Sequence, residues 1–348
     1  MRMTLFQKLA TAALVALLGL MVVGAVVRVT GSGLGCPDWP MCWGCLIPPS
    51  SVDEINFSKL PMEKFKDAAA KEGLDRDTIN EQSLRGEFNV RHAWTEYINR
   101  LSSGPVSLLT LATFIAAFRH RERPLVFWMA FGAVLLLVAN ALVGAVVVST
   151  LLKPAIITGH LALAMLMLGA LAYCACRGTE DPWQIELKGG QKPLRIAVLL
   201  LLAVVVAEGF LGTQVRQMTD QMSRAHVHEP RSQWIGELEQ SWKYLVHRSF
   251  SWAVLFVAIW AWLLSKRHRV GGPGRVEKAV LGVVIFQMLL GVIMSQIHIY
   301  AWVQVVHIGL ASLLLALIWV WWFGLSAGRK WVKPMIPDVS GNGARQIV

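Results

Sequence analysis

The sequence predicts an all-α integral membrane protein with eight transmembrane helices. Of its 348 residues, 55% are hydrophobic and only 16% are charged, and the mean hydropathy is +0.51. Soluble domains of this length rarely have such a composition. Eight apolar runs are long enough to cross the hydrocarbon core of a bilayer, which takes roughly 20 residues. An internal repeat divides these runs into two sets of four.

The eight runs lie near residues 9–29, 95–118, 125–149, 155–176, 195–216, 244–264, 276–297 and 302–325. The first run follows basic residues, as a secretory signal would. It is too long for such a signal, however, and no small-x-small cleavage site follows it. We therefore interpret it as the first transmembrane helix.

Basic residues are concentrated in every second connection between the runs. They are Arg119, Arg121, Arg123, Arg177, Lys188, Lys192, Arg195, Lys266, Arg267, Arg269, Arg275, Arg329, Lys330 and Lys333. The positive-inside rule then predicts a multi-pass protein of the cell inner (plasma) membrane with both termini cytoplasmic. Because membrane topology explains the net charge of +11, we expect membrane lipid and no nucleic acid as a partner.

Two stretches of the chain, 147 residues apart, share one pattern. Each has an amide residue, a glycine four positions later and a histidine sixteen positions after that glycine. The two sets are Asn140, Gly144 and His160, and Gln287, Gly291 and His307. Parallel repeats of four helices predict two four-helix bundles related by a pseudo-twofold axis along the membrane normal.

We place the N-terminal half at residues 1–180 and the C-terminal half at residues 181–348. The repeat offset is 188 for the first helix pair and 147 or 148 for the others, so the first half carries about 40 extra residues. They fall in an extended outward loop at about residues 31–92. This loop is polar and mixed in charge, and residues 62–71 could form a short surface helix.

Matched histidines inside apolar runs are the best clue to function. Gly144 and His160 each lie about eight residues from the expected turn at Leu152, roughly 12 Å along each helix, so they face each other. His247 and His307 lie at a similar depth in the second half, and paired neutral imidazoles are the usual axial ligands of a haem in a membrane bundle. A structural hydrogen-bonding role is the alternative, but a repeated set of costly intramembrane histidines favours ligands.

His92, Glu96 and Asn99 share one helix face because they are spaced by four and three residues. Glu96 is the only carboxylate of that predicted segment. It would be costly there unless it faced a cavity or a cation, and the alternative is a helix cap near the interface.

Several other polar residues lie close to the expected sites. Arginines near the outer helix ends could pair with haem propionates or extend to lipid headgroups; they are Arg28, Arg100, Arg216 and Arg248. Glu208 and Gln214 are inward-facing candidates without an assigned role.

The first outward loop contains Cys36, Cys42 and Cys45. An oxidising compartment permits one disulfide there and leaves one thiol over. Cys174 and Cys176 lie at the cytoplasmic end of the fourth run, where we expect free thiols.

These residues resemble the haem A synthase family over all eight predicted helices. The matching segments are Arg28-Val-Thr-Gly-Ser-Gly-Leu-Gly-Cys36-Pro-Asp-Trp-Pro-Met-Cys42, Glu96-Tyr-Ile-Asn99-Arg100, His160, His247-Arg248 and His307. The resemblance implies an oxidoreductase that converts the C8 methyl group of haem O to a formyl group by successive hydroxylations. The product, haem A, serves the assembly of cytochrome oxidase.

The resemblance also implies site residues and partners. His247 and His307 would ligate the iron of a resident haem b, an electron relay, and the N-terminal half would hold the substrate haem O with Glu96 near its reacting methyl group. Cys36 and Cys42 match a disulfide pair of the family. Haem O synthase and an electron donor are expected partners, and a homo-oligomer is compatible with this interpretation.

One position departs from the family pattern. Many relatives carry histidine where this chain has Asn99, and asparagine is a poor ligand of haem iron. Either His92, two turns earlier on the same face, serves as the second ligand, or His160 is the single protein ligand of the substrate haem. We favour the second arrangement.

Two other functions compete with this interpretation. A di-haem b-type membrane electron carrier needs the axial histidines but no carboxylate such as Glu96 beside one haem. A haem or small-molecule transporter is suggested by the repeat alone and would contain no tightly bound haem.

Overall fold

The computed structural model describes residues 3–71, 75–120, 122–180, 182–188, 191–226, 231–297 and 300–326. Within this part of the chain, eight helices are long and apolar enough to cross a membrane. They are α1 (Leu5–Val29), α4 (Val90–Ala117), α5 (Pro124–Ser149), α6 (Pro154–Arg177), α7 (Gln191–Ala225), α9 (Trp242–His268), α10 (Arg275–Gln296) and α11 (Ala301–Leu325). The predicted fold class, an all-α integral membrane protein, is confirmed.

Local sequence signals set where these helices begin. Thr4 opens α1 with a capping box, and Asn89 opens α4 by accepting a hydrogen bond from the His92 N–H at 3.2 Å. Pro124 and Pro154 occupy the first positions of α5 and α6, where a missing N–H is harmless. The described helices therefore begin within a few residues of the predicted runs.

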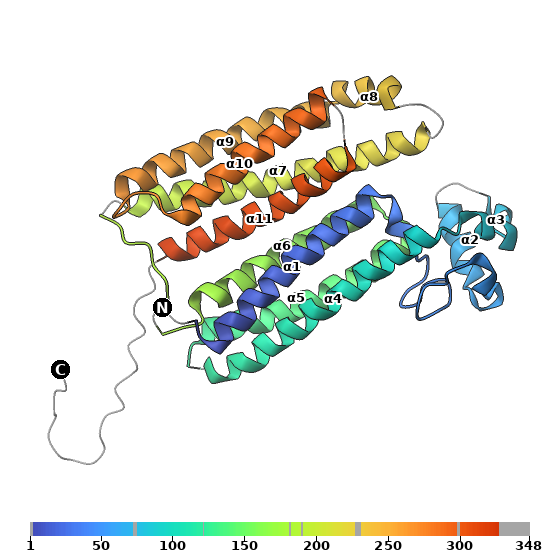
Figure 1. Cartoon of the computed structure of the whole chain (residues 1–348), viewed down its shortest axis with the longest axis horizontal. Helices are drawn as coiled ribbons and strands as arrows, with labels where there is room; N and C mark the ends of the chain where they lie inside the picture. The colour runs from blue at the N-terminus through green and yellow to red at the C-terminus, as the bar shows by residue number, and fades with distance from the viewer. Residues whose placement is uncertain are drawn as a thin grey trace, which may run out of the picture.

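The transmembrane helices form two groups of four (Figure 1). In the first group α1 and α5 each pack against both α4 and α6, and in the second α7 and α10 each pack against both α9 and α11. The groups meet where α11 packs against α1 and α6. This neighbour order agrees with the repeat, while the pseudo-twofold axis and the boundary at residue 180 stay predictions.

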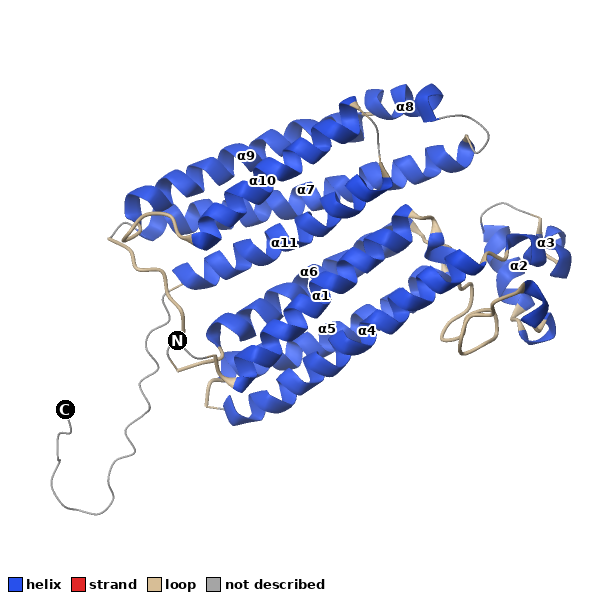
Figure 2. Ribbon diagram, in the orientation of Figure 1, coloured by secondary structure: helices blue, strands red, loops and turns tan. Residues whose placement is uncertain are grey.

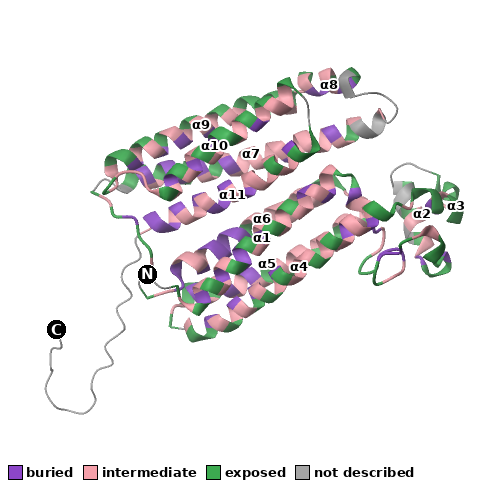
Figure 3. Ribbon diagram, viewed as in Figure 1, coloured by how far each residue is buried: buried purple, intermediate pink, exposed green. Residues whose placement is uncertain are grey.

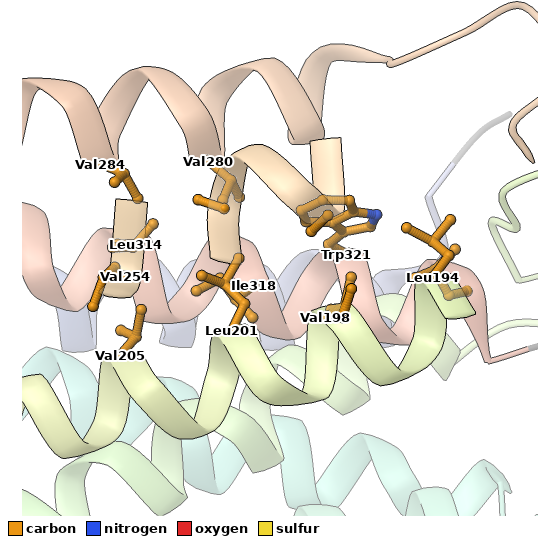
Figure 4. Packing of buried hydrophobic residues seen from close by; sticks show 14 of the residues in the cluster. Leu194, Val198, Leu201, Val205, Val254, Val280, Val284, Leu314, Ile318 and Trp321 are labelled. Atoms are coloured by element: carbon orange, nitrogen blue, oxygen red, sulfur yellow. The ribbon is translucent and has the colours of Figure 1, made fainter. Parts of the chain in front are cut away.

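The second group is held together by a core of apolar side chains (Figure 4). On α7 the buried residues Leu194, Val198, Leu201 and Val205 recur every three or four positions, the spacing of one helix face. They cluster with Trp321 of α11 and with buried residues of α9 and α10. Exposed residues recur along the transmembrane helices (Figure 3). Many large apolar side chains are among them, as lipid contact requires.

Polar contacts join the two groups at both membrane ends. At the end where α1 begins and α11 ends, Arg177 of α6 donates a hydrogen bond to the Phe323 carbonyl of α11 at 2.5 Å. At the opposite end, Asp220 of α7 pairs with Arg216 at 2.8 Å and with Arg28 of α1 at 3.5 Å. The first of these carboxylate contacts lies within α7, and the second crosses between the groups.

α7 continues to Ala225, past the predicted end at residue 216. No glycine or proline lies between Gly212 and Pro230, so nothing in the sequence stops the helix where its apolar run ends. The short helix α8 (Arg231–Gln240) follows at the same end of the molecule and was not predicted.

The extended loop forms a cap at that end of the first group, beside the start of α4 (Figure 2). It contains α2 (Met62–Lys71), which confirms the expected surface helix, and α3 (Glu81–Glu87). Single-turn helices complete the described elements: η1 (Ser32–Leu34), η2 (Val52–Glu54), η3 (Phe57–Lys59), η4 (Arg76–Thr78) and η5 (Phe118–His120). A small core that includes Trp43, Phe57 and Leu84 holds the cap together.

Candidate functional site

The loop after α1 is closed by a disulfide bond between Cys36 and Cys42, with an S–S distance of 1.98 Å. This confirms the predicted pair, and Cys45, Cys174 and Cys176 are free thiols. Cys42 and Cys45 also exchange two backbone hydrogen bonds of 2.8 and 3.1 Å. The three cysteines of the loop therefore lie in one tight turn.

This turn is seated on the first turns of α4. The Asp38 carboxylate accepts hydrogen bonds from the backbone N–H groups of Trp43 at 2.6 Å and Gly44 at 2.7 Å. The Trp43 indole donates to the Gly35 carbonyl at 2.7 Å. A Cβ atom at Gly35 would lie only 2.2 Å from the His92 carbonyl oxygen, so only glycine fits there.

Glu96 is clamped between this loop and Arg100. It is 4% exposed, and its Oε2 accepts a hydrogen bond from the Cys36 N–H at 2.7 Å while its Oε1 accepts one from Arg100 at 2.5 Å. Arg100 also donates to the backbone carbonyls of Cys36, Asp38 and Met41. A paired cation and a backbone donor offset the cost of burying the carboxylate. Glu96 thus faces a cation, one of the two environments that the sequence predicted for it.

In the first group, Asn99 and His160 each face a glycine. A Cβ at Gly24 of α1 would lie 3.8 Å from Asn99 Oδ1, and one at Gly144 of α5 would lie 3.4 Å from His160 Cε1. The second contact confirms that Gly144 and His160 face each other. Nδ1 of His160 and Oδ1 of Asn140 are both buried without a hydrogen bond.

In the second group, His247 lies between two residues of α7. A Cβ at Gly212 would be 3.3 Å from His247 Cε1, and Glu208 Oε1 lies 3.1 Å from His247 Nδ1. His307 is near enough to His247 for the two rings to interact electrostatically. Gln287 of α10 donates a hydrogen bond to the His307 carbonyl at 2.8 Å. The two predicted haem b ligands therefore lie in the same helix group, on α9 and α11.

The glycines of the repeat are not equivalent. A Cβ at Gly291 would meet no atom within 4 Å, so His307 does not repeat the contact between Gly144 and His160. The glycine contact of the second group is made by Gly212 against His247 instead.

The histidine level of both groups has features that fit a haem. Nδ1 of His160, His247 and His307 is buried without an aligned hydrogen bond, an uncommon state for a buried polar atom. On α6 and α9 the buried residues begin inward of the histidines, at Ala164 and Val254, whereas Val303 of α11 and Ala25 of α1 are buried near the histidine level. Imidazoles whose Nδ1 atoms lack an aligned partner, two of them with a glycine beside the ring, are suited to a flat, iron-containing ligand.

The arginines expected near haem propionates have other partners. Arg100 makes four hydrogen bonds within the clamp around Glu96. Arg216 bonds with Asp220, the Arg28 carbonyl and Gln304, and Arg28 pairs with Asp220. Arg248 is exposed, and its side chain interacts with Tyr244. Their role toward propionates stays a prediction.

His92 lies in the first turn of α4, two turns or roughly 10 Å along the axis from Asn99. Asn99, and not His92, occupies the position that faces the glycine of α1. This placement supports His160 as the single histidine ligand of the first group.

The sequence did not single out Asp220 or Gln304, although both contact the predicted site residue Arg216. The spacing of four residues between Arg216 and Asp220 is a signal for an ion pair on one helix face. It was hidden because the helix was predicted to end at residue 216.

Known proteins are similar to this chain over most of its length. A sequence profile of the family described as cytochrome oxidase assembly protein matches residues 7–319. A haem A synthase of Shewanella oneidensis is 23% identical over 315 residues, which cover 84% of this chain and 88% of that protein. Haem A synthases of Sphingopyxis alaskensis and a Methylobacterium species are 25% and 27% identical over 327 and 324 residues, covering 87% and 85% of both chains. The chain therefore belongs to the haem A synthase family of cytochrome oxidase assembly proteins.

Proposed function

We propose that this chain is an enzyme of haem A biosynthesis, a haem A synthase that oxidises the C8 methyl group of haem O to a formyl group. Its relatives with that name match most of its length. The observation that carries the proposal is the set His160, His247 and His307 inside an eight-helix membrane protein, with the buried carboxylate of Glu96 in the first group. A pure electron carrier needs no such carboxylate.

In the second group, His247 and His307 are the residues that would hold the iron of a haem b. A haem b bound there supplies one-electron transfer. The role of the chain is to bring two imidazoles from α9 and α11 together and to keep α7 close to them. Written with water as the oxygen donor, conversion of a methyl group to a formyl group releases four electrons and four protons, so the electrons need such a path to an acceptor outside the chain.

In the first group, His160 is the residue that would hold the iron of haem O. Asn99 replaces the histidine that the second group has at the equivalent position, and asparagine is a poor ligand of iron. The two groups thus differ in ligand set, which separates a substrate site from a relay site.

Glu96 would act on the reacting methyl group from α4. It lies on the same helix face as Asn99, one turn closer to the cap, and its contacts with Arg100 and the Cys36 N–H fix its position. A fixed carboxylate can stabilise positive charge that develops during oxidation or accept a proton.

We also propose a location in the plasma membrane with both termini in the cytoplasm. The cap and α8 then face outward, where an oxidising compartment maintains the disulfide between Cys36 and Cys42.

The test is to express the chain with and without a haem O synthase and to extract the haems. We expect haem A only when the synthase is present, and no haem A from Glu96→Ala. The matched control is Glu81→Ala, which removes an exposed carboxylate that also pairs with an arginine four residues later. Haem B alone under both conditions would contradict the proposal and favour a di-haem electron carrier.

A further inference from the structure

We propose that Glu208 of α7 is a positioning residue for the haem b site. Its carboxylate accepts a hydrogen bond from the Nδ1–H of His247 and strengthens that imidazole as an iron ligand. This inference rests on the proposed role of His247 as a haem b ligand. It concerns a carboxylate to which neither the motifs nor the family resemblance assigned a role.

The contact is close and largely shielded from solvent. Oε1 of Glu208 lies 3.1 Å from Nδ1 of His247, and the two side chains are 17% and 23% exposed. The two atoms are within hydrogen-bonding distance but not aligned, so the proposed bond requires the ring to turn. Because Nδ1 faces the carboxylate, Nε2 is the nitrogen that remains to bind iron.

Both contacts of α7 with His247 come from one helix face. Glu208 and Gly212 are four residues apart, so the carboxylate and the bare backbone lie one turn from each other. Gly212 lets the ring approach α7, and Glu208 lies beside Nδ1 of that ring. The second oxygen of Glu208, Oε2, is buried without a hydrogen bond. A half-paired carboxylate is costly inside a membrane protein, which argues for a function beyond packing.

The first group lacks the pair altogether. At the repeat offset of 188, Gly212 corresponds to Gly24 and Glu208 to Leu20. At the offset of 148, His247 corresponds to Asn99. The carboxylate and the histidine that it contacts are therefore absent together, although the facing glycine is retained. We expect the two residues to be absent together if the carboxylate supports the iron-binding histidine.

His160 and His307 each have a backbone group beside the ring, where His247 has a carboxylate. The backbone of Asn140 lies beside His160, and the backbone of Gln287 lies beside His307. Only His247, among these three, has a carboxylate at its Nδ1. A carboxylate accepts a stronger hydrogen bond from Nδ1–H than a carbonyl does, which makes the imidazole a stronger electron donor to iron. The stronger donor and the nearby negative charge both stabilise ferric over ferrous iron.

The test is a redox titration of the purified, haem-loaded protein together with electron paramagnetic resonance of its ferric low-spin signal. We expect Glu208→Gln to retain the haem and to raise its midpoint potential, because the amide accepts a hydrogen bond but carries no charge. Glu208→Asp, which keeps the charge on a shorter side chain, should give a smaller shift. Glu180→Gln, which removes a carboxylate that is 92% exposed, is the control and should leave the potential unchanged.

An unchanged potential and unchanged ferric signal in Glu208→Gln, at full haem content, would overturn the inference. If Glu208→Gln lost its haem, the aspartate variant would decide, since haem retained by Glu208→Asp would show that the charge is needed, and haem lost from both variants would overturn the inference. The readouts need no catalytic turnover. A wild-type protein that binds low-spin haem but forms no haem A would contradict the proposed function and leave this inference standing, whereas a wild-type protein without low-spin haem would remove both.

Discussion

Glu96 combines structural contacts with the chemical role that we propose for it. Its two carboxylate oxygens are bonded to Arg100 and to the backbone N–H of Cys36, so it anchors the disulfide loop on α4. In the proposed site, the same contacts would hold it beside the substrate haem. Substitution by alanine disturbs both roles, and a subtler change is needed to separate them.

Glu96→Gln is the variant that separates them. The amide can still accept from the Cys36 N–H but removes the charge that pairs with Arg100, so the loop should stay in place. We expect haem A formation to fall on the order of a hundredfold, the usual contribution of a proton-handling carboxylate, with protein yield unchanged. Glu81→Gln, in the exposed pair with Arg85, should lose nothing. Wild-type haem A levels in Glu96→Gln would show that Glu96 only anchors the loop.

At the scale of the helix, α5 presents two glycines to different surroundings. A Cβ at Gly144 would touch the ring of His160, whereas a Cβ at Gly132 would meet nothing within 4 Å. The two positions give a matched pair on one element.

Gly144→Leu should fill the space beside His160 and reduce haem A formation by about tenfold or more, because forcing extra methylene groups against a ring costs roughly 1–3 kcal/mol. Gly132→Leu should leave haem A formation near the wild-type level. Haem extraction from membranes that contain equal amounts of each protein makes the comparison. Equal effects of the two substitutions would mean that the site does not lie at the face of α5 near His160.

The cap is a second element whose stability can be tested. Cys36 and Cys42 are six residues apart, and closing so short a loop stabilises the fold by about 2 kcal/mol in the chain-entropy account. Cys36→Ser should therefore make the cap more sensitive to limited proteolysis from the outer side while the transmembrane helices persist. Cys176→Ser, at a free thiol on α6, is the control. Identical proteolysis of both variants would show that the cap does not depend on the disulfide.

At the scale of the whole molecule, the two helix groups are joined by polar contacts at each membrane end. Asp220 contacts arginines of both groups, and its partners Arg28 and Arg216 are only 24% and 17% exposed. Without the carboxylate, two cations would face each other across the interface.

Asp220→Ala should lower the free energy of unfolding by about 1.5–3 kcal/mol, the range for hydrogen bonds to charged groups. The melting temperature in detergent measures this, with Asp67→Ala, in an exposed pair of the cap, as the control. An unchanged melting temperature for Asp220→Ala would show that the ion pairs do not hold the groups together.

The orientation of the whole molecule is testable with reporter fusions. An alkaline phosphatase fused within the cap should be active, because the cap is expected outside, and one fused in the connection between α6 and α7 should be inactive. The reverse result would invert the proposed topology.

Much of this molecule follows from the sequence alone. Hydrophobic run length determines the eight spans, because a bilayer admits only helices or closed barrels and each helix needs about 20 apolar residues. The repeat predicted which helices belong together, and one-dimensional spacing was enough to place Gly144 opposite His160.

Contacts between distant segments could not be predicted in this way. The clamp of Arg100 on three loop carbonyls, the meeting of Arg28 and Arg216 at Asp220, and the approach of Glu208 to His247 all depend on how helices rotate and pack. The sequence by itself determined the fold class and identified His160, His247 and His307 as the candidate ligands, because periodicity and hydrophobicity are local properties. Only the tertiary structure decided which charges pair and which ring nitrogen faces a carboxylate, because those depend on side chains brought together from helices far apart in the chain.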